Sequence, residues 1–161
     1  MTNVTERMAG PRPVVDCDSK PFWDAAARGE LLLQVCAACQ RWQFPPRAQC
    51  ARCAADVTWR AASGTATLYS YTVVHRAPAG FADAVPYAVG LGDLIEGVRM
   101  VAVVDAPLDS ITIGQALQVA FARRSDDFVL PVFRPKPGRP DDARDLTPIS
   151  ATQQEPLSRR G

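Results

Sequence analysis

The order of hydrophobic and polar positions predicts a β-rich region in the second half of the chain. Residues Thr65 to Arg76 read T-A-T-L-Y-S-Y-T-V-V-H-R, where β-branched and aromatic residues dominate and the two faces alternate. Turn signals such as Glu96-Gly97 separate this run from four similar ones, which are Tyr87–Asp93, Arg99–Asp105, Leu117–Arg123 and Phe128–Phe133. A sheet this small leaves no exposed edge when it closes on itself. Residues 61–134 are therefore predicted to form a five-stranded OB-fold barrel.

Residues 19–35 predict a short helix followed by a lead-in strand. Pro21 suits a helix start and Gly29 a helix end, which brackets a helix over Phe22–Arg28. About two turns are too few for a stable isolated helix, so it must pack on a hydrophobic surface. That surface is either the core of this chain or another subunit. Phe22 and Trp23 are large enough to anchor a partner subunit and are the candidates for that role.

Both ends of the chain are rich in proline and poor in aliphatic residues. Residues 1–18 and 135–161 do not carry enough apolar surface to offset the entropy of ordering them. We expect the first segment to be disordered or extended, and the second to be a proline-rich tail that orders only along a partner.

The composition is that of a globular protein, with 47% hydrophobic and 22% charged residues among 161. No apolar run reaches the roughly 20 residues needed to cross a bilayer, and the first 13 residues lack a secretory signal. Five cysteines in such a chain indicate a reducing compartment and a metal site before they indicate disulfides. We therefore expect a cytoplasmic protein that does not bind membranes.

The net charge of +1 conceals an uneven distribution. Residues 36–60 carry four basic and one acidic side chain, whereas residues 61–134 carry five basic and seven acidic ones. The basic surplus at 36–60 is either a solvated surface or a patch that faces an acidic partner or a phosphate-bearing ligand.

The strongest local motif is a pair of C-x-x-C sequences within residues 36–60. Two such pairs, ten residues apart, can close a tetrahedral site around one zinc ion, with Cys36, Cys39, Cys50 and Cys53 as ligands. Four thiolates leave no open coordination position, so the zinc is predicted to be structural. Because the other core candidates are few, metal removal is expected to unfold residues 36–60.

Other readings of the cysteines are weaker. A thioredoxin-like redox pair lacks its βαβ context. Iron in a rubredoxin-like site uses the same ligands, but Gln40 and Ala54 follow the two pairs where glycine would most easily let backbone amides point at sulfur, which favours zinc. Cys17 is interpreted as a bystander thiol without a catalytic role. A catalytic cysteine needs a nearby base, His75 is the only histidine in the sequence, and no sequence feature places it next to Cys17.

Motifs of independent catalysis are missing from the sequence. There is no G-x-S-x-G, H-E-x-x-H, P-loop or G-x-G-x-x-G motif. The carboxylate pairs Asp126-Asp127 and Asp141-Asp142 are interpreted as solvated turn and tail residues. The sequence therefore favours binding or assembly over a self-contained enzyme.

Several segments together resemble a known family. They are P-F-W-D-A-A-A-R-G-E-L-L-L-Q-V-C-A-A-C-Q-R-W-Q-F-P-P-R from Pro21 to Arg47, Y-S-Y-T-V-V-H-R from Tyr69 to Arg76, V-P-Y from Val85 to Tyr87, and L-P-V-F-R-P from Leu130 to Pro135. This ordered series is similar to the bacterial and archaeal proteins with a zinc ribbon and an OB fold that accompany acyl-CoA enzymes. The resemblance covers about residues 20–135. The missing glycines after the cysteine pairs and the two tails depart from the family pattern.

The resemblance implies a mainly β protein with an N-terminal helix, a rubredoxin-like zinc ribbon and a C-terminal OB-fold barrel. It implies a non-catalytic accessory subunit of a thiolase-type complex, including sterol-carrier-type thiolases and aldolases, which supports assembly and the access or binding of a CoA thioester during C–C bond cleavage or formation. The loop from His75 to Pro86, with Arg76 and Phe81, would approach the partner's active site or the CoA arm; the alternative interpretation is a long surface loop without such a role. Arg134 is a weaker candidate for a phosphate contact, and Phe133 is expected in the core.

Two other functions stay open at the level of sequence. OB barrels and zinc ribbons also bind single-stranded nucleic acid, but that activity needs a basic groove with stacking aromatics, and residues 61–134 are net acidic. The second alternative is a rubredoxin-like electron carrier.

Overall fold

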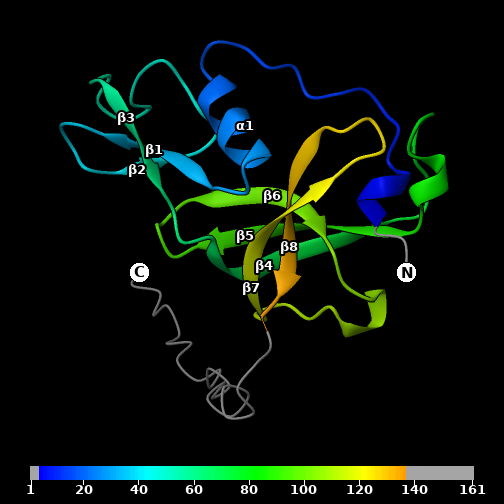
Figure 1. The fold of residues 1–161 in the computed structure, drawn as a ribbon. Coiled ribbons are helices and arrows are strands. Elements are labelled where there is room, and N and C mark those ends of the chain that lie inside the picture. The colour runs from blue at the N-terminus through cyan, green and yellow to red at the C-terminus, as the bar shows by residue number, and fades with distance from the viewer. Residues whose placement is uncertain (1–3, 137–161) are drawn as a thin grey trace, which may run out of the picture.

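The computed structural model describes residues 4–136 (Figure 1). The prediction of a proline-rich tail therefore lies, beyond Lys136, outside the described residues. The helices are η1 (Val4–Arg7), α1 (Lys20–Ala27), η2 (Ala82–Ala84) and η3 (Leu108–Ser110), and the strands are β1 (Leu32–Cys36), β2 (Trp42–Gln43), β3 (Val57–Ala61), β4 (Thr65–Val74), β5 (Tyr87–Leu94), β6 (Arg99–Val104), β7 (Ala116–Arg123) and β8 (Val129–Pro135). None of the helices in residues 4–136 is long and apolar enough to cross a membrane.

Strands β4 to β8 form a closed barrel in the order β4-β5-β6-β8-β7, with β7 pairing back onto β4. All neighbours are antiparallel except β6 and β8, which run parallel. Each of the five runs predicted from the alternating pattern is one of these strands, with ends that differ by one or two residues. The predicted five-stranded OB-fold barrel is confirmed.

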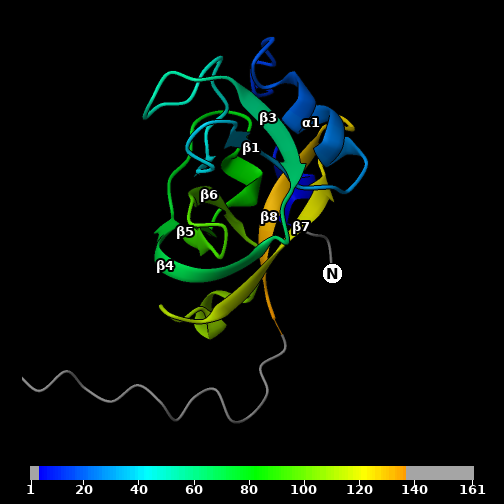
Figure 2. The ribbon, with the colours of Figure 1, turned by 90° about the vertical axis from the view of Figure 1, so that its left-hand side faces the viewer.

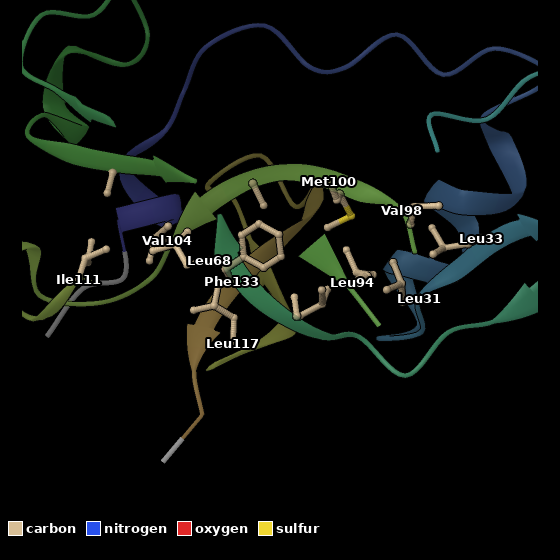
Figure 3. Close-up of a cluster of buried hydrophobic side chains, with 14 of the residues drawn as sticks. Leu31, Leu33, Leu68, Leu94, Val98, Met100, Val104, Ile111, Leu117 and Phe133 are labelled. Carbon is tan, nitrogen blue, oxygen red and sulfur yellow. The ribbon is translucent and has the colours of Figure 1, made fainter. Parts of the chain in front are cut away.

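Large side chains from every strand fill the barrel. Leu68, Met100, Leu117 and Phe133 are buried, and Phe133 lies at the centre of the cluster in Figure 3. Gly92 of β5 makes room for the Phe133 ring, because a Cβ at that position would lie 2.5 Å from Phe133 Cζ. The prediction that Phe133 is a core residue is confirmed.

The remaining strands form a small antiparallel sheet in the order β2-β1-β3, which carries the cysteines. This sheet and α1 lie together on one side of the barrel in both views (Figures 1 and 2). Leu31 and Leu33, at the start of the sheet, belong to the same buried cluster as Leu94 and Val98 at the β5–β6 hairpin (Figure 3). The two modules therefore share one hydrophobic core.

The N-terminal segment differs from its expectation. Residues Val4–Arg7 form a 3₁₀ turn, and Thr5 and Met8 are buried. The backbone N–H of Ala9 donates a hydrogen bond to the Gly80 carbonyl at 2.6 Å. The segment that was expected to be disordered or extended over residues 1–18 thus contains a short 3₁₀ turn at Val4–Arg7, and its burial depends on contacts with parts of the chain that are distant in sequence.

Candidate metal centre and partner-facing residues

The two cysteine pairs lie on two turns with the same hydrogen-bond pattern. In the first, Cys36 N–H donates to the Arg41 carbonyl at 2.9 Å and Gln40 N–H donates to the Cys36 carbonyl at 3.1 Å. In the second, Cys50 and Ala54 take the places of Cys36 and Gln40, with both bonds at 2.9 Å. This repetition brings two matching turns face to face, each presenting two sulfur atoms.

The four sulfur atoms converge on one point. All lie within 4.8 Å of one another, with 3.5 Å between the sulfurs of Cys36 and Cys53 and 3.8 Å between those of Cys39 and Cys50. Zinc bound tetrahedrally by four sulfurs at about 2.3 Å separates the sulfurs by about 3.8 Å. The donor set and its spacing therefore fit a zinc ion, which these four cysteines would hold.

Backbone amides prepare the sulfurs for a cation. The N–H of Arg52, and after it that of Cys53, donates to the Cys50 sulfur and lowers the pKa of Cys50 to about 6. The N–H of Cys39 lowers the pKa of Cys36 in the same way, with a donor–sulfur distance of 3.3 Å. For Cys53 the Ala55 N–H acts in the same direction, but hydrogen bonds with Cys36 and Cys50 prevail and raise its pKa to about 11. Neighbouring thiolates repel one another, so all four ionise together only around a cation.

The residues after the cysteine pairs adopt the backbone conformation that usually favours glycine. Gln40 has φ 55° and Ala54 has φ 56°, both in the left-handed region. The absence of glycine thus does not prevent the turn that points amides at sulfur, so these two positions do not distinguish zinc from iron. The turns are strained instead.

A buried glutamine, which the sequence did not single out, holds the loop between the two cysteine turns. Gln34 on β1 is 3% exposed; its amide donates to the Arg47 carbonyl and its Oε1 accepts from the Arg47 N–H, each at 2.9 Å. Gln43 donates to the same Oε1 at 2.7 Å. Gln34 lies in an apolar strand, and a polar residue at such a position was the available signal.

The two aromatic residues of α1 lie differently from each other. Phe22 is 3% exposed and packs against the ring of Phe44, with 5.5 Å between centroids. It is therefore not available to a partner, and that prediction for Phe22 is corrected: the helix packs on its own core. Trp23 is half-buried, 5.1 Å from the Phe128 ring between centroids, and stays a candidate for a partner contact.

The loop from His75 to Pro86 extends beyond the barrel and contains the short helix η2. His75 and Arg76 are exposed, and Phe81 is half-buried against Gly10 of the N-terminal segment. The structure thus places two of the three loop candidates on the surface and uses the third within the chain. Arg134 is at the end of β8, where its Nε lies 2.8 Å from Asp105 Oδ2.

Two other sequence interpretations can be placed. Cys17 is exposed, and its sulfur lies 3.8 Å from Asp18 Oδ1. Asp126 is more than a solvated turn residue, because it pairs with Arg12 at 2.8 Å and with the buried Arg124 at 3.2 Å. Asp127 is as expected, with a side chain 86% exposed.

Most arginines of the barrel already have a carboxylate partner. Of the five between residues 61 and 134, Arg99, Arg123, Arg124 and Arg134 each lie within ion-pair distance of an aspartate, and Arg76 on the loop is the fifth. Arg99 also stacks over the Tyr69 ring, 3.4 Å from its centroid. These pairings leave little unneutralised positive charge on the described barrel surface.

Comparison with known domains finds a match along two adjoining stretches of the chain. Residues 23–58 match the domain described as "ChsH2, rubredoxin-like zinc ribbon domain". Residues 59–122 match "ChsH2, C-terminal OB-fold domain". The two matches meet between Thr58 and Trp59 of β3, where the small sheet continues toward the barrel.

Curated relatives match over the same part of the chain. A probable enoyl-CoA hydratase alpha subunit of Thermomonospora curvata is 37% identical over 127 residues, which is 78% of this chain and 40% of that protein. A DUF35 domain-containing scaffold protein of Methanocaldococcus jannaschii is 32% identical over 95 residues, which is 57% of this chain and 67% of the relative. The chain thus spans less than half the length of the hydratase subunit and about two thirds of the scaffold protein.

Solved structures share the fold. The subunit of an "Ltp2-ChsH2(DUF35) aldolase" superimposes with a TM-score of 0.70 and 36% identity, covering 77% of this chain and 98% of that chain. A DUF35 protein of unknown function from Sulfolobus solfataricus superimposes with a TM-score of 0.56 over 76% of this chain and 87% of that one; at 14% identity it shows the fold alone.

Proposed function

We propose, because this chain belongs to the ChsH2 (DUF35) family of proteins with a rubredoxin-like zinc ribbon and an OB fold, that it is a non-catalytic accessory subunit of an acyl-CoA-processing enzyme complex. The observation that carries the proposal is the similarity to the subunit of the aldolase complex, which extends over 98% of that subunit at 36% identity. The names of the other relatives, a hydratase subunit and a scaffold protein, support the same role.

The more specific proposal concerns the partner and its substrate. The partner is a thiolase-type enzyme, either a thiolase or an aldolase of that fold, that forms or cleaves a C–C bond in a CoA thioester. The face formed by α1 and the zinc ribbon, including Trp23, contacts this enzyme. The exposed loop residues His75 and Arg76 border its substrate entrance, where the CoA thioester is a ligand shared by the two subunits; Arg134 is a secondary candidate for a phosphate contact.

The zinc ion has a structural role in this proposal. Cys36, Cys39, Cys50 and Cys53 hold it, and four thiolates leave no position for water or substrate. The ion would cross-link the two cysteine turns and would take no part in catalysis. The proposed zinc content is one ion per chain, measured by elemental analysis of the purified protein.

The decisive experiment begins in the native host. The tagged full chain is purified, the co-purifying enzyme is identified by mass spectrometry, and the two are co-expressed and separated by size-exclusion chromatography. We expect co-elution and a partner whose acyl-CoA activity falls when this chain is omitted. A partner that never co-elutes and works equally well alone would contradict the proposal.

The loop has its own test in that complex. Arg76→Ala is compared with Lys136→Ala, which removes a cation beside Thr65, at the opposite end of β4 from the loop. We expect Arg76→Ala to raise the KM for the acyl-CoA or to weaken the complex, and Lys136→Ala to do neither. Equal kinetics and equal affinity for the two variants would remove the loop from the proposal and leave the accessory role intact.

The nucleic-acid alternative is disfavoured by the aspartate partners of the barrel arginines. Binding to single strands needs a positively charged groove that follows the backbone. Fluorescence anisotropy with labelled oligonucleotides at low salt tests this alternative. A rise in anisotropy on addition of the protein that disappears at higher salt would favour nucleic-acid binding. The electron-carrier alternative predicts a coloured iron protein, so a colourless protein with one zinc per chain would exclude it.

A further inference from the structure

The N-terminal residues 4–12, here called the strap, cross the barrel from one loop to another. In Figure 1 the strap runs from η1, beside the loop that carries η2, toward the β7–β8 hairpin. At the loop side, Ala9 N–H donates to the Gly80 carbonyl at 2.6 Å and Arg7 donates to the Asp83 carbonyl at 3.2 Å. A Cβ on Gly10 would lie 1.9 Å from the Phe81 ring, so the ring packs directly on the strap backbone.

The other side of the strap is held by a buried arginine. The Arg124 side chain is 2% exposed, and its guanidinium donates to the Gly10 carbonyl and, at 3.3 Å, to the Pro11 carbonyl. Asp126 balances this charge at 3.2 Å and also accepts from Arg12 of the strap at 2.8 Å. A buried guanidinium is costly without partners, and the strap supplies two of the carbonyls to which Arg124 donates.

The strap contacts the two loops that flank the ligand site of the fold. OB barrels bind ligands on the face of strands 2 and 3, between the loop that joins strands 1 and 2 and the loop that joins strands 4 and 5. In this barrel those loops are residues 75–86, between β4 and β5, and residues 124–128, between β7 and β8. The strap makes hydrogen bonds to both of them.

We infer that the strap is an intramolecular ligand of the barrel and holds the loop 75–86 in a fixed conformation, with Arg124 as the positioning residue. The inference goes beyond the proposed function, since it concerns this chain in the absence of a partner. The burial of the Met8 side chain adds an apolar contact to these polar ones, and Thr5 is buried as well.

Hydrogen–deuterium exchange of the full zinc-loaded chain tests this. Arg124→Gln removes the buried charge, and Arg123→Gln is the matched control, because Arg123 is its neighbour on the chain but is exposed and pairs only with Asp127. Losing a charged hydrogen-bond donor to two carbonyls should raise the exchange of amides in residues 76–86 by about tenfold or more. Arg123→Gln should leave these amides unchanged.

A second variant displaces the strap without touching Arg124. Gly10→Val places a side chain where the Phe81 ring now lies, whereas Ala9→Val introduces the same side chain at an exposed position. We expect Gly10→Val to accelerate exchange in residues 76–86 and to spare the amides of β5 and β6. The inference fails if neither Arg124→Gln nor Gly10→Val changes exchange in the loop. It fails equally if both accelerate all five barrel strands to the same extent, because the strap would then be general support for the fold.

Discussion

Ala54 illustrates how a single residue stores strain in the zinc ribbon. It adopts φ 56°, where a Cβ crowds the following carbonyl at a cost of about 1–2 kcal/mol and where glycine has no such cost. Ala54→Gly should therefore raise the free energy of unfolding of the zinc-loaded protein by about 1 kcal/mol in denaturant titrations. Gln40→Gly should gain less, because Gln40 Nε2 donates to the Ala37 carbonyl at 2.8 Å and that bond is lost. A larger gain for Gln40→Gly would contradict this account.

Gln34 is the residue on which the loop between the cysteine turns depends. Replacing it with leucine keeps its approximate size but leaves the N–H and the carbonyl of Arg47 without their partner. We expect a loss of about 1–3 kcal/mol in unfolding free energy, measured by denaturant titration. Gln49→Leu, at an exposed position on the same loop, should change it by less than about 0.5 kcal/mol. Equal effects of the two variants would show that the metal, and not Gln34, keeps the loop between the cysteine turns in its conformation.

Asp126 makes the attachment of the strap sensitive to acid. Partial burial opposes its charge, but the hydrogen bonds from Arg12 and from Phe128 N–H, with the charges of Arg124 and Arg12, hold the pKa of Asp126 below its usual range. A lowered pKa stabilises the folded state above the unfolded value of about 3.9 and ceases to do so as the pH falls. The difference in unfolding free energy between the wild type and Asp126→Asn, measured by denaturant titration, should thus become smaller below about pH 4. A gap that stays constant down to pH 3 would rule out this pairing as the cause.

At the scale of elements, the metal is expected to stabilise the cysteine turns and the hydrophobic core to stabilise the barrel strands. Residues 36–56 contain the two cysteine turns. Among them only Cys36 and Cys50 are fully buried, and the aromatic residues Trp42 and Phe44 are half-buried. Zinc removal by a chelator should therefore abolish exchange protection in residues 36–56, while the amides of β4 to β8 stay protected by the barrel core. Restoring zinc should restore protection. If the whole barrel lost protection at the same chelator concentration, the zinc would support more than the ribbon.

The elements differ in how far the sequence predicts them, for physical reasons. The barrel strands alternate with period two and are separated by turn residues, so their existence and nearly their ends follow from local patterns. The cysteine site follows from spacing. The strap has no such local signal. The burial of Met8 and the hydrogen bond from Arg124 to the Gly10 carbonyl form only when segments far apart in the sequence come together. Phe22 was ambiguous for the same reason: its size shows that it is buried, but not by which chain.

At the scale of the whole molecule, the boundary between the two matched domains is not a boundary of the core. The family matches divide the chain between residues 58 and 59, within β3. The buried cluster, however, runs from Leu31 and Leu33 on the ribbon side to Leu94 and Met100 in the barrel (Figure 3). The ribbon with its helix is therefore packed against the barrel through one core, which is consistent with the proposal that both modules contact one partner.

This shared core predicts that the zinc-loaded chain unfolds as one unit. Leu33 is 1% exposed, and Leu33→Ala should cost about 2–5 kcal/mol by loss of buried surface and creation of a cavity. Because Leu33 contributes to the packing of both modules, zinc release and loss of barrel β-structure should shift together to lower denaturant concentration. Leu32→Ala, at the neighbouring half-buried position, is the matched control and should shift both transitions less. Two separate transitions, with zinc release moved by Leu33→Ala and the barrel unaffected, would show that the modules are independent.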